Sequence, residues 1–396
     1  MIDSIELFCG TGGLALGLQQ AGFRHNALIE WDKDSCENIN ANITEGFPLI
    51  QDWSVIQSDV RSVDFARDYK GVTLVSGGPP CQPFSLGGKH KAYNDARDMF
   101  PQAVRAVREI KPKAFIFENV KWLLRTSFHT YFNYIILQLR HPDIVITEDM
   151  TWEDHMRLLN RIDKSGVREN QGYDVKCHLF NAADYGVPQQ RYRVVIVGFR
   201  NDTGLSWDIP APTHSKEALL YAKWITGEYW KKHGLDVPSI PEKEKAALER
   251  IKAHPPETLP WCTVRDAFRG LPDPTSEEGK AIKNHEFRSG ARVYAGHSGS
   301  SLDEPSKTIK AGAHGVPGGE NMVVLDDGTQ RYYTIRESAR IQTFPDDYSF
   351  HGSWTESMRQ IGNAVPVRLA RIIGESVYEQ LRGVSENAIK SGVSPS

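Results

Sequence analysis

The amino-acid sequence predicts an open α/β fold followed by a smaller, more irregular domain. Four short apolar runs, at residues 4–8, 26–29, 72–75 and 114–117, have the length and composition of buried strands. The first run leads through a glycine-rich loop into a segment with helical spacing of apolar residues. From about residue 201 the sequence becomes rich in proline, glycine and balanced charge. We therefore expect one large α/β domain and one smaller domain within the 396 residues.

Composition and cysteine usage exclude several classes of protein. The formal net charge is −3, so any surface that binds nucleic acid must be local. The five cysteines are scattered, without the spacing typical of disulfide frameworks or zinc sites. No apolar run approaches the ~18 residues of a membrane span, and the first residues do not resemble a signal peptide. We expect a protein of the reducing cytoplasm, without a metal site or a membrane partner.

The loop after the first strand is a candidate cofactor site. Gly10, Gly12 and Gly13 separate the strand from the helical segment. Glycines let the backbone approach a ligand closely, and the amides of such a loop can face a nucleotide-like cofactor. The spacing is not G-x-G-x-x-G, so a tight turn packed on the sheet is the structural alternative.

Acidic residues stand at the end of the second predicted strand and in a later polar break. Glu30 ends the second strand, where a carboxylate can accept hydrogen bonds from ribose hydroxyls. Trp31 follows it and could stack on an adenine. A solvated strand end and a core aromatic are the alternatives. Asp59 lies in a short polar break at residues 58–60 and would suit a further contact to the cofactor base.

A single thiol follows the apolar run 72–75. Cys81 comes directly after Pro79 and Pro80, whose fixed φ angles stiffen the loop. A stiff loop that presents one thiol suits a nucleophile, because its orientation is set before the substrate binds. A small buried cysteine beside a turn is the alternative.

Charged side chains also stand at the end of one predicted strand and at the start of another. Glu118 ends the run 114–117, where open α/β sheets bind ligands and where burial can raise a carboxyl pKa, as a general acid requires. Arg191 and Arg193 precede an apolar strand with i, i+2 spacing, which predicts a fork on one face for an anionic or carbonyl-rich ligand. Two exposed arginines are the alternative. The polar insertion at 147–171 has no role that we can assign.

Taken together, these segments resemble the bacterial-type DNA (cytosine-5)-methyltransferase family. The resemblance covers nearly the whole chain apart from its variable middle. The matching motifs stand in the family's order: FCGTGG at 8–13, EW at 30–31, Asp59, GPPCQ at 78–82, ENV at 118–120, QQRYR at 189–193, RESARIQTFP at 336–345 and GNAVP at 362–366.

The resemblance implies a Rossmann-like class I methyltransferase sheet with helices on both faces, together with a smaller target-recognition domain. It implies S-adenosylmethionine as the cofactor and duplex DNA, with the target cytosine flipped out, as the substrate. Cys81 would attack C6 of the cytosine, Glu118 would protonate N3, and Arg193 would contact O2 with support from Arg191. The residues that would bind the cofactor are Phe8, Gly10, Gly12, Gly13, Glu30, Trp31, Asp59, Val60, Pro80 and Asn363.

The resemblance also implies how the chain is divided and where it works. Residues 1–200 would form the catalytic domain that binds S-adenosylmethionine, 201–333 the target-recognition domain, and 334–396 a hinge and the return to the catalytic domain. The enzyme would belong to a restriction–modification system in the bacterial cytoplasm, associated with the nucleoid through DNA, with a cognate endonuclease acting separately. Transfer-RNA cytosine-5 methyltransferases share these motifs and are the nearest alternative. A dinucleotide-dependent oxidoreductase and a non-catalytic DNA-binding module are alternatives from other classes.

Overall fold

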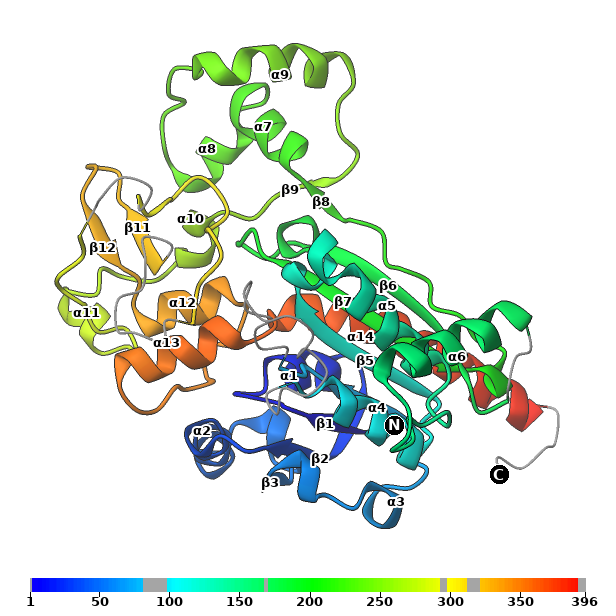
Figure 1. Ribbon diagram of the computed structural model, residues 1–396. Helices are drawn as coiled ribbons and strands as arrows, with labels where there is room; N and C mark the ends of the chain where they lie inside the picture. The colour runs from blue at the N-terminus through cyan, green and yellow to red at the C-terminus, as the bar shows by residue number, and fades with distance from the viewer. Residues whose placement is uncertain (1, 81–97, 167–169, 293–297, 312–320, 391–396) are drawn as a thin grey trace. The chain divides into compact units, whose positions relative to one another are not determined.

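The computed structural model describes residues 2–80, 98–166, 170–292, 298–311 and 321–390, and it divides into two compact units (Figure 1). Unit 1 comprises Met1–Phe180, Tyr192–Ile209 and Ala370–Ser396, and unit 2 comprises Asn181–Arg191 and Pro210–Leu369. The C-terminal segment therefore returns to the unit in which the chain begins.

Unit 1 is built on a seven-stranded sheet with the order β3-β2-β1-β4-β5-β7-β6. Neighbouring strands among β1 to β5 pair in parallel, whereas β7 pairs antiparallel with β5. Because β1, β2, β4 and β5 run parallel, their carboxyl ends lie at one edge of the sheet. The strand order reverses between β1 and β4, and open α/β sheets bind ligands at the carboxyl ends beside such a reversal. The strands are β1 (Ile2–Leu7), β2 (Phe23–Glu30), β3 (Val55–Gln57), β4 (Leu74–Gly77), β5 (Ala114–Val120), β6 (Tyr173–Asn181) and β7 (Tyr192–Arg200). The predicted α/β class is confirmed.

Helices cover both faces of this sheet (Figure 1). Alternate strand residues such as Leu7, Val75 and Phe117 share one apolar core with the helices of the first face. On the other face α14 packs against α1 and β2, and the rings of Phe23 and Tyr378 meet edge to face with centroids 5.3 Å apart. The helices of this unit are α1 (Gly13–Gln20), α2 (Lys33–Thr44), α3 (Phe65–Asp68), α4 (Phe100–Ile110), α5 (His129–Arg140), α6 (Trp152–Ser165) and most of α14 (Val367–Lys390).

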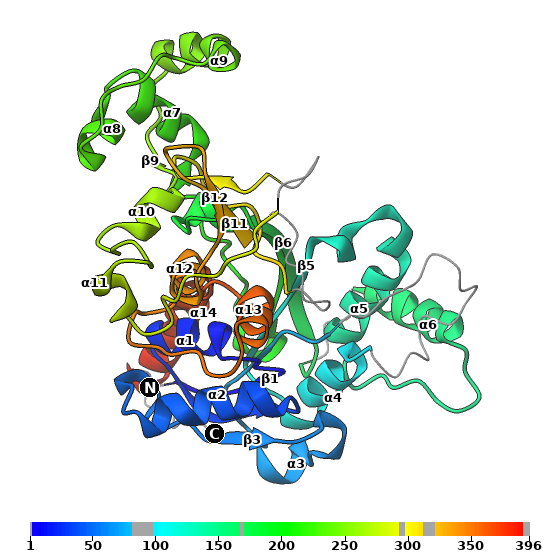
Figure 2. The ribbon, with the colours of Figure 1, turned by 90° about the vertical axis from the view of Figure 1, so that its left-hand side faces the viewer.

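The polar insertion contains helix α6, which lies beside α5 in both views (Figures 1 and 2). Thr151 and Asp154 form a capping box at its start. Leu159 is buried in a small cluster with Tyr134 of α5, whose hydroxyl lies 2.7 Å from Nδ1 of His155. Sequence reasoning missed this helix because charged side chains dominate it and only His155 and Leu159 are buried.

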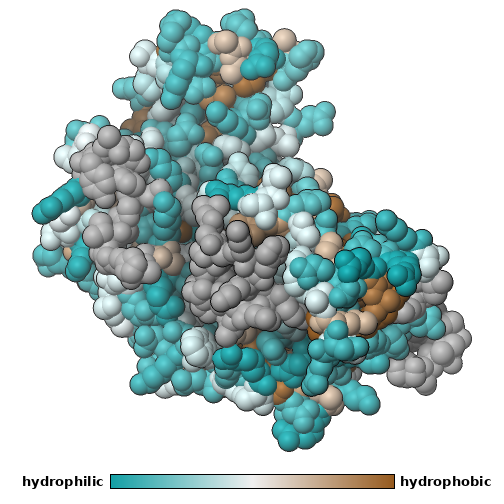
Figure 3. Space-filling view, viewed as in Figure 1, coloured by the Kyte–Doolittle hydropathy of each residue, from teal (hydrophilic) through white to brown (hydrophobic). Residues whose placement is uncertain are grey.

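Unit 2 combines a helical part with a small three-stranded sheet of order β10-β11-β12. Apolar side chains gather between α7 and α9 (Figure 3), where Leu220 packs against Leu248 and Ile251. The elements of unit 2 are β8 (His214–Ser215), α7 (Lys216–Trp224), α8 (Glu228–His233), α9 (Glu242–Ala253), β9 (Leu259–Pro260), α10 (Val264–Phe268), α11 (Glu277–Lys280), β10 (Ser300–Ser301), β11 (Met322–Val324), β12 (Gln330–Tyr332), α12 (Ile335–Ile341) and α13 (Trp354–Asn363).

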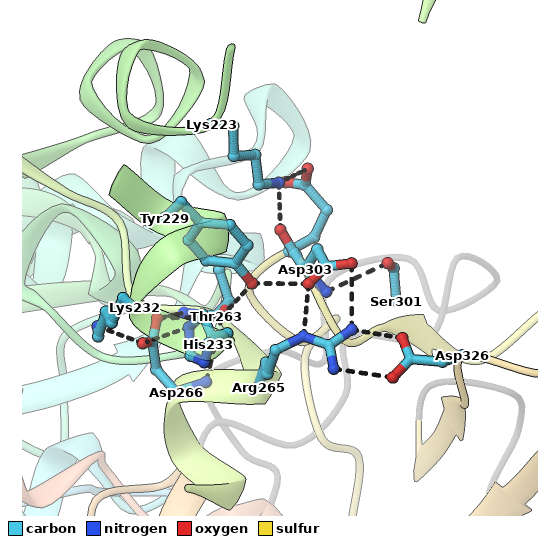
Figure 4. A network of polar contacts seen from close by, with 11 residues as sticks. Lys223, Tyr229, Lys232, His233, Thr263, Arg265, Asp266, Ser301, Asp303 and Asp326 are labelled. Carbon is cyan, nitrogen blue, oxygen red and sulfur yellow. Dashed lines mark hydrogen bonds and ion pairs between the residues drawn. The ribbon is translucent and has the colours of Figure 1, made fainter. Parts of the chain in front are cut away.

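A polar network joins the helical part of unit 2 to the loops of its small sheet (Figure 4). Arg265 of α10 binds Asp303 through Nε at 2.7 Å and Asp326 through Nη1 at 2.9 Å. The Tyr229 hydroxyl donates to Asp303 at 2.8 Å, and the buried ammonium of Lys223 donates to the Asp303 carbonyl. Asp303 thus accepts hydrogen bonds from side chains of α7, α8 and α10. This network fixes the positions of these helices relative to the loop that follows β10.

Candidate active site

The glycine-rich loop begins directly after β1 and has an unusual backbone. Phe8 has a φ of 56°, which is rare for a bulky residue, and its amide donates to the Ile29 carbonyl at 2.8 Å. Gly12 is the N-cap of α1 with a φ of 82°, and a Cβ there would lie 3.2 Å from the Trp53 ring. A glycine is therefore required where the loop turns into Gly13 and α1. The loop backbone is held against the end of β2.

Glu30 ties this loop to the second strand. One carboxylate oxygen accepts from the Gly10 amide at 2.8 Å, and the other accepts from the amides of Trp31 and Asp32, both at 2.9 Å. A carboxylate has about four acceptor positions, so Glu30 can still accept a hydroxyl donor. The Trp31 side chain is 72% exposed, which excludes the core-aromatic alternative and leaves its ring free to stack on a ligand.

The remaining predicted cofactor residues of unit 1 lie at the same edge of the sheet, but they differ in how accessible they are to a ligand. Asp59 follows β3, and hydrogen bonds from the Arg61 side chain and backbone lower the pKa of its carboxyl. Val60 is buried in the apolar core, so it can offer only its backbone or one edge of its side chain to a ligand. Pro80 is exposed, and its carbonyl accepts from the Met99 amide at 3.1 Å.

Glu118 and Arg193 form a buried ion pair between β5 and β7, with 2.5 Å between Oε1 and Nε. The antiparallel register puts Val120 opposite Arg193, which brings the two side chains together. Burial lowers the pKa of Arg193, and the Glu118 carboxylate partly offsets this effect. The guanidinium remains cationic at neutral pH because its ordinary pKa is far above 7.

The loop that follows β4 is bound directly beside this pair. Asn119 Nδ2 donates to the Pro79 carbonyl at 2.9 Å, and a Cβ on Gly78 would lie 3.3 Å from Oε2 of Glu118. Cys81 itself lies outside the described residues. Asn119 belongs to the ENV motif, and its position next to Glu118 is the sequence signal for this structural role, which the sequence alone did not predict.

The other cysteines have environments that disfavour a thiolate. Burial raises the pKa of Cys9 well above its ordinary value and raises that of Cys36 to about 12. Burial also raises the pKa of Cys177 and Cys262. Because the thiolate is the reactive form, none of these four described thiols is suited to nucleophilic attack.

Arg191 does not form the predicted fork with Arg193, and that expectation is wrong. β7 begins at Tyr192, so Arg191 precedes the strand. Within unit 2, its fully buried guanidinium donates to the carbonyls of Ile309 at 3.0 Å, Gly362 at 2.6 Å and Ala364 at 3.0 Å.

Asn363 belongs to the segment that Arg191 and Gln342 hold. Gln342 donates to the Ile361 carbonyl at 2.6 Å, whereas the Asn363 side chain is exposed at the end of α13. Gln189 accepts from the Ile309 amide at 3.1 Å and donates to Gln342 at 2.9 Å. Residues far apart in the sequence therefore fix one turn of backbone around Asn363.

Two features of the described residues bear on other functions. They contain no group of three or more His, Cys, Asp or Glu side chains arranged to hold a metal ion. Their helices include none with the length and apolar character needed to cross a bilayer.

Comparison with known proteins gives consistent matches along the chain. The family model for C-5 cytosine-specific DNA methylases matches residues 2–144 and 148–379. The type II methyltransferase M.PspPI of Psychrobacter sp. (strain TA137) is 34% identical over 391 residues, covering 98% of this chain and 81% of that protein. M.Eco47II of Escherichia coli is 32% identical, covering 96% of this chain and 80% of that protein. Among solved structures, the S. pombe Dnmt2 methyltransferase aligns with a TM-score of 0.54 at 16% identity, covering 97% of this chain and 99% of that chain, which shows a shared fold.

Proposed function

The chain belongs to the C-5 cytosine-specific DNA methylase family, and we propose that it methylates a flipped-out cytosine through Cys81, Glu118 and Arg193. It is a DNA (cytosine-5)-methyltransferase of the type II restriction–modification class. The observation that carries the proposal is the hydrogen bond from Asn119 to Pro79, which holds the backbone two residues before Cys81 next to the Glu118–Arg193 pair.

The proposed reaction uses these three side chains in turn. The Cys81 thiolate forms a bond to C6 of the cytosine while Glu118 donates a proton to N3, so the ring becomes an enamine that is nucleophilic at C5. Arg193 holds Glu118 and contacts the cytosine O2. After methylation at C5, the C5 proton leaves to solvent and the C6–S bond breaks, which re-forms the C5–C6 double bond and releases the Cys81 thiolate. The N3 proton returns to Glu118, which restores the neutral ring and the acid.

We propose S-adenosylmethionine as the methyl donor, bound at the glycine-rich loop. When bound, it supplies the electrophilic methyl group. The residues fit such a molecule: the Glu30 carboxylate retains acceptor capacity for ribose hydroxyls, Trp31 offers an exposed ring, and the Gly10 and Gly12 backbone permits close approach. Phe8, Gly13, Asp59, Val60, Pro80 and Asn363 complete the proposed set.

The proposed reaction also divides the chain into functional parts. We assign residues 1–200 to catalysis, 201–333 to target recognition, and 334–396 to a hinge and the return to the catalytic domain. Arg191 acts in this scheme as a positioning residue for the backbone around Asn363. We also propose a cognate endonuclease that acts separately and a location in the bacterial cytoplasm, on nucleoid DNA; the likeness to type II methyltransferases supports both proposals.

The test measures transfer of labelled methyl groups from S-adenosylmethionine to duplex DNA and, in parallel, to transfer RNA. We expect transfer to DNA, and transfer to RNA alone would overturn the proposed substrate. Cys81→Ser should abolish transfer while retaining DNA binding, because the hydroxyl is a far weaker nucleophile. Cys177→Ser, at an exposed position of β6, is the matched control and should retain activity. Full activity of Cys81→Ser would refute the nucleophile assignment.

A further inference from the structure

An exposed cluster of cations and aromatic rings lies next to the proposed catalytic pair. β5 ends at Val120, and the 3₁₀ helix η4 (Lys121–Leu124) follows at once. We call Lys121, Trp122, Arg125 and Tyr192 the Trp122 surface. All four are exposed, with Trp122 at 48%, whereas Leu123 between them is buried in the main apolar core. The surface is therefore anchored from below rather than attached to a loose loop.

Each cation of the Trp122 surface is held by a ring. The Lys121 ammonium lies 4.7 Å from the centroid of the Tyr192 ring, and the Arg125 guanidinium lies over the Trp122 ring. In the described part of the chain neither cation is paired with a carboxylate, so both keep their full charge for a ligand.

The Trp122 surface is joined by backbone to Glu118 and Arg193. Arg193 pairs with Val120 in the β5–β7 register, and its Nη1 donates to the Tyr192 carbonyl at 2.8 Å. Lys121 follows Val120 directly, and Tyr192 precedes Arg193. A large ligand that contacts Glu118 therefore has its neighbouring parts close to the Trp122 surface.

The local charge differs in sign from that of the whole chain. The stretch 119–142 contains Lys121, Arg125 and Arg140 and no acidic residue, although the formal net charge of the protein is −3. Arg140 pairs with Asp163, which leaves Lys121 and Arg125 as the unpaired cations of this stretch in the described structure. Two unpaired cations side by side, with no acidic residue in this stretch, suit contacts to backbone phosphates.

We propose that the Trp122 surface binds the sugar–phosphate backbone of the DNA duplex beside the target cytosine, with Lys121 and Arg125 contacting phosphates and the two rings positioning them. This inference rests on the proposed function, because it assumes that Glu118 and Arg193 hold the base. Contacts of this kind position the duplex and carry no sequence information.

The test is the salt dependence of DNA binding by the full chain, measured by fluorescence anisotropy with a duplex of mixed sequence. The logarithm of the affinity falls as the logarithm of the salt concentration rises. Removing one cation that binds a phosphate should make this slope shallower, with its magnitude reduced by about 0.9 for B-form DNA. We expect this decrease for Lys121→Ala and for Arg125→Ala, and about twice the decrease for the double variant. Lys70→Ala is the matched control: Lys70 is exposed and precedes β4, at the amino end of the parallel strands, so its slope should equal that of the wild type.

The rings are tested separately as positioning residues. Trp122→Ala should weaken DNA binding and make the salt slope shallower, because Arg125 loses the ring that positions it. Trp122→Phe keeps an aromatic face, so its affinity and slope should be close to those of the wild type. A wild-type slope in Lys121→Ala and Arg125→Ala would overturn the inference. The proposed function would fail differently, since the wild-type chain itself would then transfer no methyl group to DNA.

Discussion

Arg193 and Glu118 are joined by an ion pair of 2.5 Å between β7 and β5, and both side chains are about nine-tenths buried. The pair gives the carboxyl a fixed orientation at the edge of the sheet where the parallel strands end. A carboxyl held in this way is ready to meet a ring nitrogen without reorganisation. Methyl transfer should therefore depend on the acid function of Glu118.

Glu118→Gln should reduce methyl transfer by about 10²- to 10⁴-fold, the usual contribution of a general acid. The amide has nearly the same shape but cannot supply the N3 proton, and it replaces the carboxyl partner of Arg193. Single-turnover transfer to DNA measures the effect, with circular dichroism to verify that the variant is folded. Glu109→Gln on α4 is the control, because among the described residues its carboxylate pairs with two arginines of the same helix. Near-normal transfer by Glu118→Gln would remove Glu118 from the mechanism.

Arg191→Met should destabilise the protein by about 3 kcal/mol, because three carbonyls, two of them in fully buried hydrogen bonds, lose a charged donor. Arg191→Lys should recover only part of this loss, since one ammonium cannot reproduce the planar fork. Urea unfolding measures the free energy. The comparison variant is Arg340→Met, which removes a more exposed guanidinium that binds two carbonyls and Asp346. If Arg191→Met unfolds like the wild type yet loses activity, Arg191 has a direct catalytic contact instead of a positioning role.

The two arginines also illustrate what sequence can and cannot predict. The strand ends that carry Phe8, Glu30 and Glu118 could be located because apolar runs and glycines are local signals. The ion pair between Glu118 and Arg193 could not be located from local signals, since the β5–β7 register depends on contacts between distant segments. The direction of Arg191 could not be predicted because its partners lie more than a hundred residues away.

Buried Glu6 should make the stability of the protein depend on pH. Glu6 is 1% exposed in β1, accepts a hydrogen bond from Ser76 at 3.1 Å, and burial raises its pKa to about 8 from an ordinary value of 4.5. Between these two values the folded protein retains a proton that the unfolded chain has released. Stability contributed by this proton is present below the lower value and is lost as the pH rises towards the higher one.

Glu6→Gln removes this titration and should flatten that part of the profile. The free energy of unfolding of the variant, relative to the wild type, should rise by up to about 1.4 kcal/mol per pH unit across the window. Urea unfolding at several pH values from about 5 to about 8 gives the difference. Glu37→Gln, on the exposed side of α2, is the control and should show no such trend. Parallel profiles for the wild type and Glu6→Gln would mean that Glu6 is ionised in the folded protein.

The same substitution at two glycines of α14 should have opposite effects on stability. A Cβ on Gly374 would lie 2.8 Å from Cδ2 of Leu18 and 2.9 Å from Cβ of Ala21, whereas no described atom lies within 4 Å of a Cβ on Gly383. Gly374→Ala therefore forces α14 away from α1 and should cost about 1–3 kcal/mol, as overpacking usually does. Gly383→Ala removes backbone freedom from the unfolded chain without a clash, and it should stabilise the helix by up to about 1 kcal/mol. Thermal unfolding of the two variants measures the direction of each change in stability. Both substitutions are Gly→Ala within one helix, so the gain in helix propensity is the same for both. Equal shifts in the same direction would show that α14 does not pack against α1 as closely as the structure indicates.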